Sequence, residues 1–159
     1  MIRIALLGTG LLGESISQRL LTSGIELGVW NRNPERCQGL LNAGAASIND
    51  LEEVTANWDG VITVLRDGPV TQQVVADLGD LRGCCIIPMG TMGVSEIRAL
   101  DLQVQQQNGR CVEAPVLGSK PQAISGTLLV MAGGEPELFE QQQPLLKLLA
   151  VEPLLIGPI

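Results

Sequence analysis

The sequence predicts an α/β fold, with a doubly wound, mainly parallel sheet that carries helices on both faces. Short apolar runs alternate along the chain with amphipathic stretches of helical spacing, an order typical of parallel sheets. Hydrophobic residues make up 45% of the chain and aromatic residues only 2%, so the core has to be aliphatic, which suits strands buried on both faces. The length of 159 residues fits one domain.

The first strand, turn and helix carry the most informative motif. An apolar run at residues 2–7 leads directly into Gly8-Thr9-Gly10-Leu11-Leu12-Gly13, and apolar residues then recur at helical spacing up to Leu21. In such a turn the first glycine permits the bend, the second leaves room for a diphosphate, and the third lets the helix approach the strand. The first-turn N–H groups of the helix would face the diphosphate. The unit therefore predicts a Rossmann-type dinucleotide site, and a glycine-rich connection without a ligand is the alternative.

A second site is predicted at the end of the next strand, residues 25–30. Asn31-Arg32-Asn33-Pro34-Glu35-Arg36 follows that strand, at roughly the distance of 20 residues past the glycines where NAD sites place an acidic residue. None of the first three residues is acidic, and the Arg32 guanidinium can hold a 2′-phosphate and stack on adenine. We therefore expect NADP, bound through Arg32 and Arg36. The alternative is that Asn33 caps a helix beginning at Pro34 and both arginines are merely solvated.

The remaining elements continue the alternation. The helix from Pro34 is predicted to end near residues 42–44, and Asp50-Leu51-Glu52-Glu53 fits a capping box that opens a short helix. Further strands are predicted at 60–65, 84–87, 110–114, 126–134 and 154–156, and further helices at 69–78, 94–107 and 135–150. Ligands lie beyond the carboxyl ends of parallel strands, so we expect Leu65 and Arg66 to border the cofactor. Thr91 offers a hydroxyl at the next strand end, although alone it is typical of an ordinary turn.

Charge and cysteine usage exclude several classes of function. The formal net charge of −7 argues against a nucleic-acid surface. The four cysteines form no Cys-x-x-Cys pair and the chain has no histidine, so we expect reduced, mostly buried thiols and no metal site. The apolar run near the N-terminus, residues 4–8 at most, is too short for a signal peptide or a membrane span. We therefore expect a cytoplasmic protein that binds neither nucleic acid nor membrane.

These motifs agree in order and spacing with the β-hydroxyacid dehydrogenase family, which essentially the whole chain resembles. The family includes 3-hydroxyisobutyrate dehydrogenases, tartronate semialdehyde reductases and glyoxylate/succinic semialdehyde reductases, and its N-terminal domain resembles that of 6-phosphogluconate dehydrogenase. Residues 8–13 match its cofactor glycines, and residues 31–36 are similar to the Asn-Arg-Thr-x-x-Lys of its NADP-using members. Leu65-Arg66-Asp67 matches its nicotinamide-side turn, and Met89-Gly90-Thr91-Met92 resembles a motif whose threonine lies near the cofactor.

The most specific match is Glu113-Ala114-Pro115-Val116-Leu117-Gly118-Ser119, which is followed by the glycine-bounded run 126–134. It is similar to the family's Asp-Ala-Pro-Val-Ser-Gly-Gly segment, so the resemblance assigns substrate binding to Leu117, Gly118 and Ser119. Leu117 replaces the family's serine, and the hydroxyl expected to bind a substrate carboxylate is therefore missing. Gly118 and Ser119 can still offer backbone N–H groups to an anion.

The resemblance also implies that the catalytic residue lies outside this sequence. The family's catalytic lysine belongs to a helical domain farther along the chain, and neither Lys120 nor Lys147 lies in a matching motif. The chain has no histidine or tyrosine, so we name no catalytic residue. We expect residues 1–159 to be an NADP-binding Rossmann-like domain without the C-terminal helical catalytic and dimerisation domain.

The leading hypothesis is the NADP(H)-binding domain of an oxidoreductase. It would transfer a hydride between NADPH and a small β-hydroxyacid or semialdehyde, with a carboxylate or aldehyde substrate. One alternative is a non-catalytic NADPH-binding module, and another is an imine reductase-like enzyme domain on the same fold. The apolar residues at 154–156 predict a homo-oligomer, because they would leave apolar surface uncovered.

Overall fold

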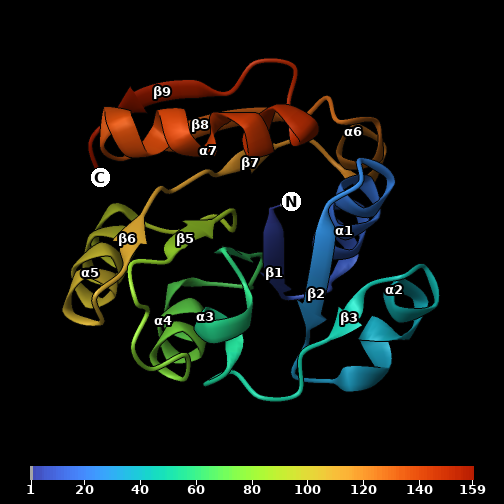
Figure 1. Ribbon diagram of the computed structural model, residues 1–159. Coiled ribbons are helices and arrows are strands. Elements are labelled where there is room, and N and C mark those ends of the chain that lie inside the picture. The colour runs from blue at the N-terminus through green and yellow to red at the C-terminus, as the bar shows by residue number, and fades with distance from the viewer. Residues whose placement is uncertain (1) are drawn as a thin grey trace.

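The computed structural model describes residues 2–159 and contains a six-stranded parallel sheet (Figure 1). The strand order is β3-β2-β1-β4-β5-β6, and every neighbouring pair is parallel. The strands are β1 (Arg3–Leu7), β2 (Glu26–Trp30), β3 (Ala46–Ser47), β4 (Gly60–Thr63), β5 (Cys85–Pro88) and β6 (Arg110–Cys111). The predicted doubly wound sheet is confirmed, and its order reverses between β1 and β4, where such sheets bind ligands.

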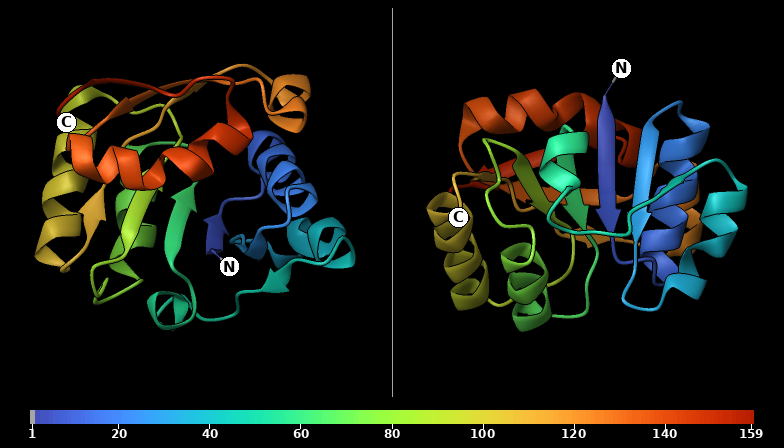
Figure 2. Two further views of the ribbon diagram at one scale, coloured as in Figure 1. Left: turned by 45° about the horizontal axis from the view of Figure 1, so that its top comes forward. Right: turned by 60° about the horizontal axis from the view of Figure 1, so that its bottom comes forward.

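Helices cover both faces of this sheet. They are α1 (Leu11–Thr22), α2 (Gln38–Asn42), α3 (Val54–Asn57), α4 (Gly68–Ala76), α5 (Val94–Gln106), α6 (Lys120–Ser125) and α7 (Pro136–Leu149), with a 3₁₀ turn, η1 (Pro34–Cys37), before α2. Figure 2 shows α7 beside α1 and, separately, α4 beside α5. The Arg19 Nε of α1 donates to the carbonyl oxygen of Leu148 at 2.8 Å, which ties α1 to the end of α7.

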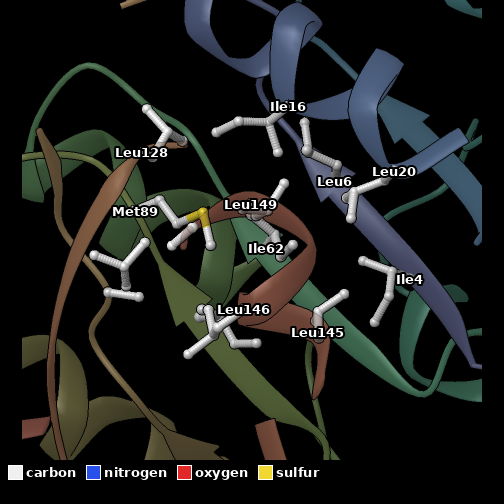
Figure 3. Close-up of a cluster of buried hydrophobic side chains, with 14 of the residues drawn as sticks. Ile4, Leu6, Ile16, Leu20, Ile62, Met89, Leu128, Leu145, Leu146 and Leu149 are labelled. Carbon is white, nitrogen blue, oxygen red and sulfur yellow. The ribbon is translucent and has the colours of Figure 1, made fainter. Parts of the chain in front are cut away.

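The alternation of side chains along β1 divides the core into two clusters. Ile4 and Leu6 pack on one face of the sheet with residues of α1 and α7, including Leu146 (Figure 3). Ala5 and Leu7 point to the other face and pack with residues of α4 and α5. All four β1 side chains are at most 2% exposed. Successive residues of a strand point to opposite faces, so a near-continuous apolar run marks a strand buried on both sides.

The last three strands form a separate sheet instead of extending the first. It contains β7 (Val116–Leu117), β8 (Leu129–Gly133) and β9 (Leu154–Gly157), with β7 and β8 antiparallel and β8 and β9 parallel. The segment after β6 joins the two sheets, because the Ala114 N–H donates to the carbonyl of Pro88 while the Glu113 carbonyl accepts from the Gly133 N–H. Residues 113 and 114 therefore bridge β8 and β5.

Several local predictions differ from the structure. Asp50 does not cap a helix: its Oδ1 accepts from the N–H of Glu52 in a turn, and α3 begins only at Val54. The predicted helix from Pro34 starts as η1 and continues as α2. Strands β3 and β7 and helix α6 were not predicted, because two-residue strands carry no periodicity. Helix α6 did have a signal, since Ser119 and Gln122 form a capping box.

The four cysteines of the chain lie in its interior. Cys37, Cys84, Cys85 and Cys111 are free and buried, as predicted. Burial raises the pKa of the Cys84 thiol to about 11 and that of the Cys85 thiol to about 12.

Within residues 2–159 no three His, Cys, Asp or Glu side chains gather as a metal site would require. No helix in the same range has the length and apolar character that crossing a bilayer demands, and the cytoplasmic location stays a prediction.

Candidate cofactor cleft

A cleft of about 520 Å³ opens at the carboxyl ends of β1, β2, β4 and β5. It lies at the position where the strand order reverses, which is the ligand site expected of an open parallel sheet. Its lining brings together segments far apart in sequence: the glycine turn, the end of β2, the residues after β4 and the residues after β5. Of the residues predicted to bind the cofactor, the cleft is lined by Gly8, Gly10, Leu11, Leu12, Gly13, Asn31, Arg32, Arg36, Leu65, Arg66 and Thr91.

Each glycine of the turn has a different physical reason. Gly8 has a φ of +109°, and a Cβ there would overlap the carbonyl oxygen of Val64. A Cβ on Gly13 would overlap the carbonyl oxygen of Gly8, so this glycine lets α1 approach β1 closely. A Cβ on Gly10 would meet no atom within 4 Å. Packing therefore requires Gly8 and Gly13, whereas at Gly10 a side chain would extend only into the open space of the cleft.

The N-terminus of α1 opens onto this space. Gly10 is the N-cap residue and supplies no side-chain hydrogen bond. The hydrogen bonds among the described residues give no acceptor to the N–H groups of Leu11, Leu12 and Gly13, and the first donor with a partner is the N–H of Glu14, which bonds to the Gly10 carbonyl at 2.8 Å. Unpaired first-turn N–H groups and the positive end of the helix dipole attract anions. The turn therefore fits a diphosphate group.

The end of the cleft beside β2 carries two arginines. Arg32 and Arg36 line the cleft with exposed side chains, and neither takes part in an ion pair within residues 2–159. Asn33 does not line the cleft: its Oδ1 accepts from the N–H of Glu35 at 3.2 Å and caps η1, as the alternative interpretation expected. The Asn33 cap and two cleft-lining arginines therefore occur together, and guanidinium groups are well suited to bind phosphate.

The opposite end of the cleft lies beside β4 and β5. Leu65, Arg66 and Thr91 line it, and their contact with a cofactor stays a prediction. The Arg66 Nε lies 2.7 Å from Oδ2 of Asp67, and Oδ1 of Asp67 accepts from the N–H of Val70 at the start of α4. The Val70 N–H, and secondarily the Arg66 guanidinium, lower the pKa of Asp67 below its ordinary value. Asp67 therefore caps α4 with one carboxylate oxygen and contacts Arg66 with the other.

Thr9 is the other predicted cofactor residue that the structure places outside the lining. Its side chain is buried, with 4% of its surface exposed. The Thr9 hydroxyl lies 3.3 Å from the carbonyl oxygen of Arg36, to which it donates, and 3.7 Å from Sγ of Cys37. Thr9 thus contacts the segment that carries an arginine of the cleft instead of facing the cleft itself.

The predicted substrate segment lies largely outside the cleft. Leu117 is 58% exposed, and neither it nor Gly118 nor Ser119 belongs to the lining, whereas Val116 does. The Ser119 hydroxyl and N–H both donate to Oε1 of Gln122, at 2.8 and 3.0 Å, because this serine caps α6. An anion would have to displace Gln122 to use either group of Ser119.

Sequence reasoning missed seven lining residues. Trp30 is the last residue of β2, Val64 and Met89 directly follow β4 and β5, and Val70 and Val74 are separated by four positions on α4. Gly90 and Val116 complete the set. Strand ends gave a signal that could have found the first three, and helical spacing gave one for the valines. Apart from Gly90, these residues contribute apolar side chains to the wall of the cleft.

The charged side chains of the cleft are all basic. Among the described residues its lining holds three arginines and no lysine, aspartate, glutamate or cysteine. Glu113 is half-buried and burial raises its pKa, but it does not line the cleft. The cleft therefore combines binding sites for anions with the absence, within residues 2–159, of a side chain suited to donate a proton.

Comparison with known proteins gives a consistent pattern. Residues 3–157 match the family described as the NAD binding domain of 6-phosphogluconate dehydrogenase. Glyoxylate/succinic semialdehyde reductase 1 of Arabidopsis thaliana is 30% identical over 98% of this chain and 56% of its own length. The structure of Mycobacterium tuberculosis 3-hydroxyisobutyrate dehydrogenase superposes with a TM-score of 0.92 and 26% identity, over 99% of this chain and 55% of that one. An imine reductase from a Pseudomonas species also has a TM-score of 0.92 and 26% identity, over 99% and 56% of the two chains. The chain spans about half the length of the curated relatives it matches.

Proposed function

Because this chain belongs to the family of the NAD-binding domain of 6-phosphogluconate dehydrogenase, we propose that it is the NADP(H)-binding domain of an oxidoreductase acting on a small β-hydroxyacid or semialdehyde. The observation that carries the proposal is the cleft itself. Within residues 2–159, it offers unpaired helix N–H groups beside Gly10 and, at the end next to β2, two arginines without ion-pair partners, Arg32 and Arg36. A dinucleotide with a third phosphate complements this distribution of donors and charge.

In this proposal each part of the cleft binds a different part of the cofactor. The first turn of α1 binds the diphosphate, and Arg32 and Arg36 bind the 2′-phosphate. Leu65, Thr91 and the apolar wall orient the nicotinamide and exclude water on that side. The chemistry that the bound cofactor supplies is transfer of a hydride to or from a carbonyl carbon. These residues bind and orient, and none of them exchanges a proton with the substrate.

We assign the proton donor to a residue that is not part of this chain. The cleft wall has no titratable side chain other than arginine within residues 2–159, and arginine stays protonated at neutral pH. The two lysines of the sequence, Lys120 and Lys147, do not line the cleft either. Oxidation of NADPH by this chain alone with glyoxylate or succinic semialdehyde would contradict this assignment.

The segment 113–116 and the relatives favour a hydroxyacid or semialdehyde substrate. Val116 lines the cleft at the end of the segment that resembles the family's substrate motif, and a relative at 30% identity is a glyoxylate/succinic semialdehyde reductase. A second candidate is imine reduction, which the similarity to the Pseudomonas imine reductase structure favours. A carbonyl substrate and a cyclic imine, each tested with NADPH and the complete enzyme, would distinguish the two.

Calorimetric titration of the chain with NADPH and with NADH tests the cofactor assignment. We expect NADPH to bind about ten times or more tightly than NADH, since a charged hydrogen bond contributes about 1.5–3 kcal/mol. 2′,5′-ADP should compete with NADPH, and 5′-AMP should compete much less. Equal affinities for the two dinucleotides would overturn the choice of NADP, and absence of binding by both would overturn the site.

A further inference from the structure

The side chain between the first two glycines of the turn points away from the cleft. Thr9 is buried against η1, where its hydroxyl donates to the carbonyl oxygen of Arg36 at 3.3 Å. Its oxygen also lies 3.7 Å from Sγ of Cys37, which is 5% exposed. The contact joins residues that are 27 positions apart in sequence. It therefore links the diphosphate turn directly to the backbone of the arginine-bearing segment.

Within residues 2–159, hydrogen bonds hold Arg36 only through its own backbone atoms. Its guanidinium is exposed and forms no ion pair within residues 2–159. Its N–H donates to the carbonyl of Asn33 at 3.1 Å, and its carbonyl accepts from Thr9. The 3₁₀ turn that carries it is only four residues long, and short 3₁₀ segments have poor hydrogen-bond geometry. Loss of the Thr9 contact would therefore loosen the backbone from which this guanidinium reaches the cleft.

We propose that Thr9 is a positioning residue that sets the preference of the cleft for a 2′-phosphate by fixing Arg36 relative to the diphosphate turn. This inference rests on the proposed function and adds a residue that does not touch the cofactor. A rigid link between the two anion sites reduces the ordering that Arg36 must undergo on binding. NADH has no 2′-phosphate for Arg36 to bind. The positioning of Arg36 by Thr9 therefore strengthens the binding of NADPH and not that of NADH.

The alternative is that Thr9 only satisfies its own buried hydroxyl. A purely structural residue would lower the melting temperature when replaced and would weaken NADPH and NADH equally. A positioning residue changes the ratio of the two affinities. Thr9→Val keeps the shape and removes the hydroxyl, whereas Thr9→Ser keeps the hydroxyl and serves as the matched control.

The test measures dissociation constants for NADPH and NADH by cofactor fluorescence, together with melting temperatures, for the wild type, Thr9→Val and Thr9→Ser. We expect Thr9→Val to weaken NADPH binding about three- to ten-fold, which corresponds to one neutral hydrogen bond. NADH binding should change less than about two-fold, and Thr9→Ser should retain the wild-type ratio. Thr9→Ala provides the same comparison if Thr9→Val does not fold.

A double-mutant cycle with Arg36→Gln tests whether Thr9 acts through Arg36. In the Arg36→Gln background, Thr9→Val should change NADPH affinity less than about two-fold, because the group that Thr9 positions is gone. The same loss in both backgrounds, or an equal loss for NADPH and NADH, would overturn the positioning role. If the wild type prefers NADPH and Thr9→Val leaves that preference unchanged, the inference fails while the proposed function stands. If the wild type shows no preference, the proposed NADP specificity itself fails.

Discussion

Replacement of Arg32 is the most direct perturbation of the proposed 2′-phosphate site. Arg32 lines the cleft, is exposed, and makes no hydrogen bond or ion pair within residues 2–159. Replacing Arg32 therefore breaks no hydrogen bond or ion pair among residues 2–159. We expect Arg32→Gln and Arg32→Asp to change the free energy of unfolding by less than about 0.5 kcal/mol. Any change in binding can then be attributed to the guanidinium.

The magnitude follows from the exposure and the charge of the site. A charged hydrogen bond contributes about 1.5–3 kcal/mol, and solvent around an exposed arginine favours the lower end, so Arg32→Gln should weaken NADPH binding about ten-fold. Arg32→Asp adds a repulsion of about 1 kcal/mol for each pair of unit charges at 4 Å in water, which brings the loss to roughly two decades. NADH has no 2′-phosphate and can lose only the stacking of the guanidinium on adenine, so its affinity should fall much less than that of NADPH.

Isothermal titration with NADPH and NADH at low and high salt measures both affinities. Arg98→Gln is the matched control, since Arg98 is an exposed arginine on α5 that does not line the cleft. Its affinities should equal those of the wild type. The preference for NADPH should also decrease as salt increases, because the contact is exposed. An unchanged NADPH/NADH ratio in Arg32→Asp would refute the reasoning.

Three further predictions concern other parts of the molecule. Gly10→Ala should melt at nearly the temperature of the wild type but lose NADPH binding, because its Cβ would meet no protein atom. Gly13→Ala should melt at a lower temperature, because its Cβ would overlap the carbonyl oxygen of Gly8. A lower melting temperature for Gly10→Ala than for Gly13→Ala would disprove this. The Arg3 side chain donates a hydrogen bond to Asp59 and lowers the pKa of that carboxyl. The stability that this contact contributes is therefore present above about pH 4 and is lost as the pH falls through the lowered pKa. Melting curves of the wild type and Asp59→Asn should therefore differ at pH 7 and converge in acid, and a gap that persists at pH 2 would contradict this. The exposed Ile156 on β9 should promote self-association. Light scattering at rising protein concentration should therefore show oligomers, and fewer of them for Ile156→Ser. A wild type that stays monomeric would disprove this prediction.

The local parts of this site were predictable because their causes are local. Gly8 needs a positive φ and Gly13 a close approach, and both requirements follow from a strand, a turn and a helix that are adjacent in sequence. The end of β2 and its arginines were predictable for the same reason. Five of the six strands of the parallel sheet were predicted as short apolar runs, whereas β3, β7 and the separation of β7, β8 and β9 into a sheet of their own were not.

The amino-acid sequence by itself determined the alternation of strands and helices, the glycine turn and the placement of arginines after β2, since each depends on backbone preferences within a short stretch of chain. Only the tertiary structure decided that Thr9 faces Arg36 and that residues 116–117 pair with β8. The physical reason is that these contacts depend on the register and packing of segments brought together by the fold, and nothing in the local pattern specifies which way a buried hydroxyl points.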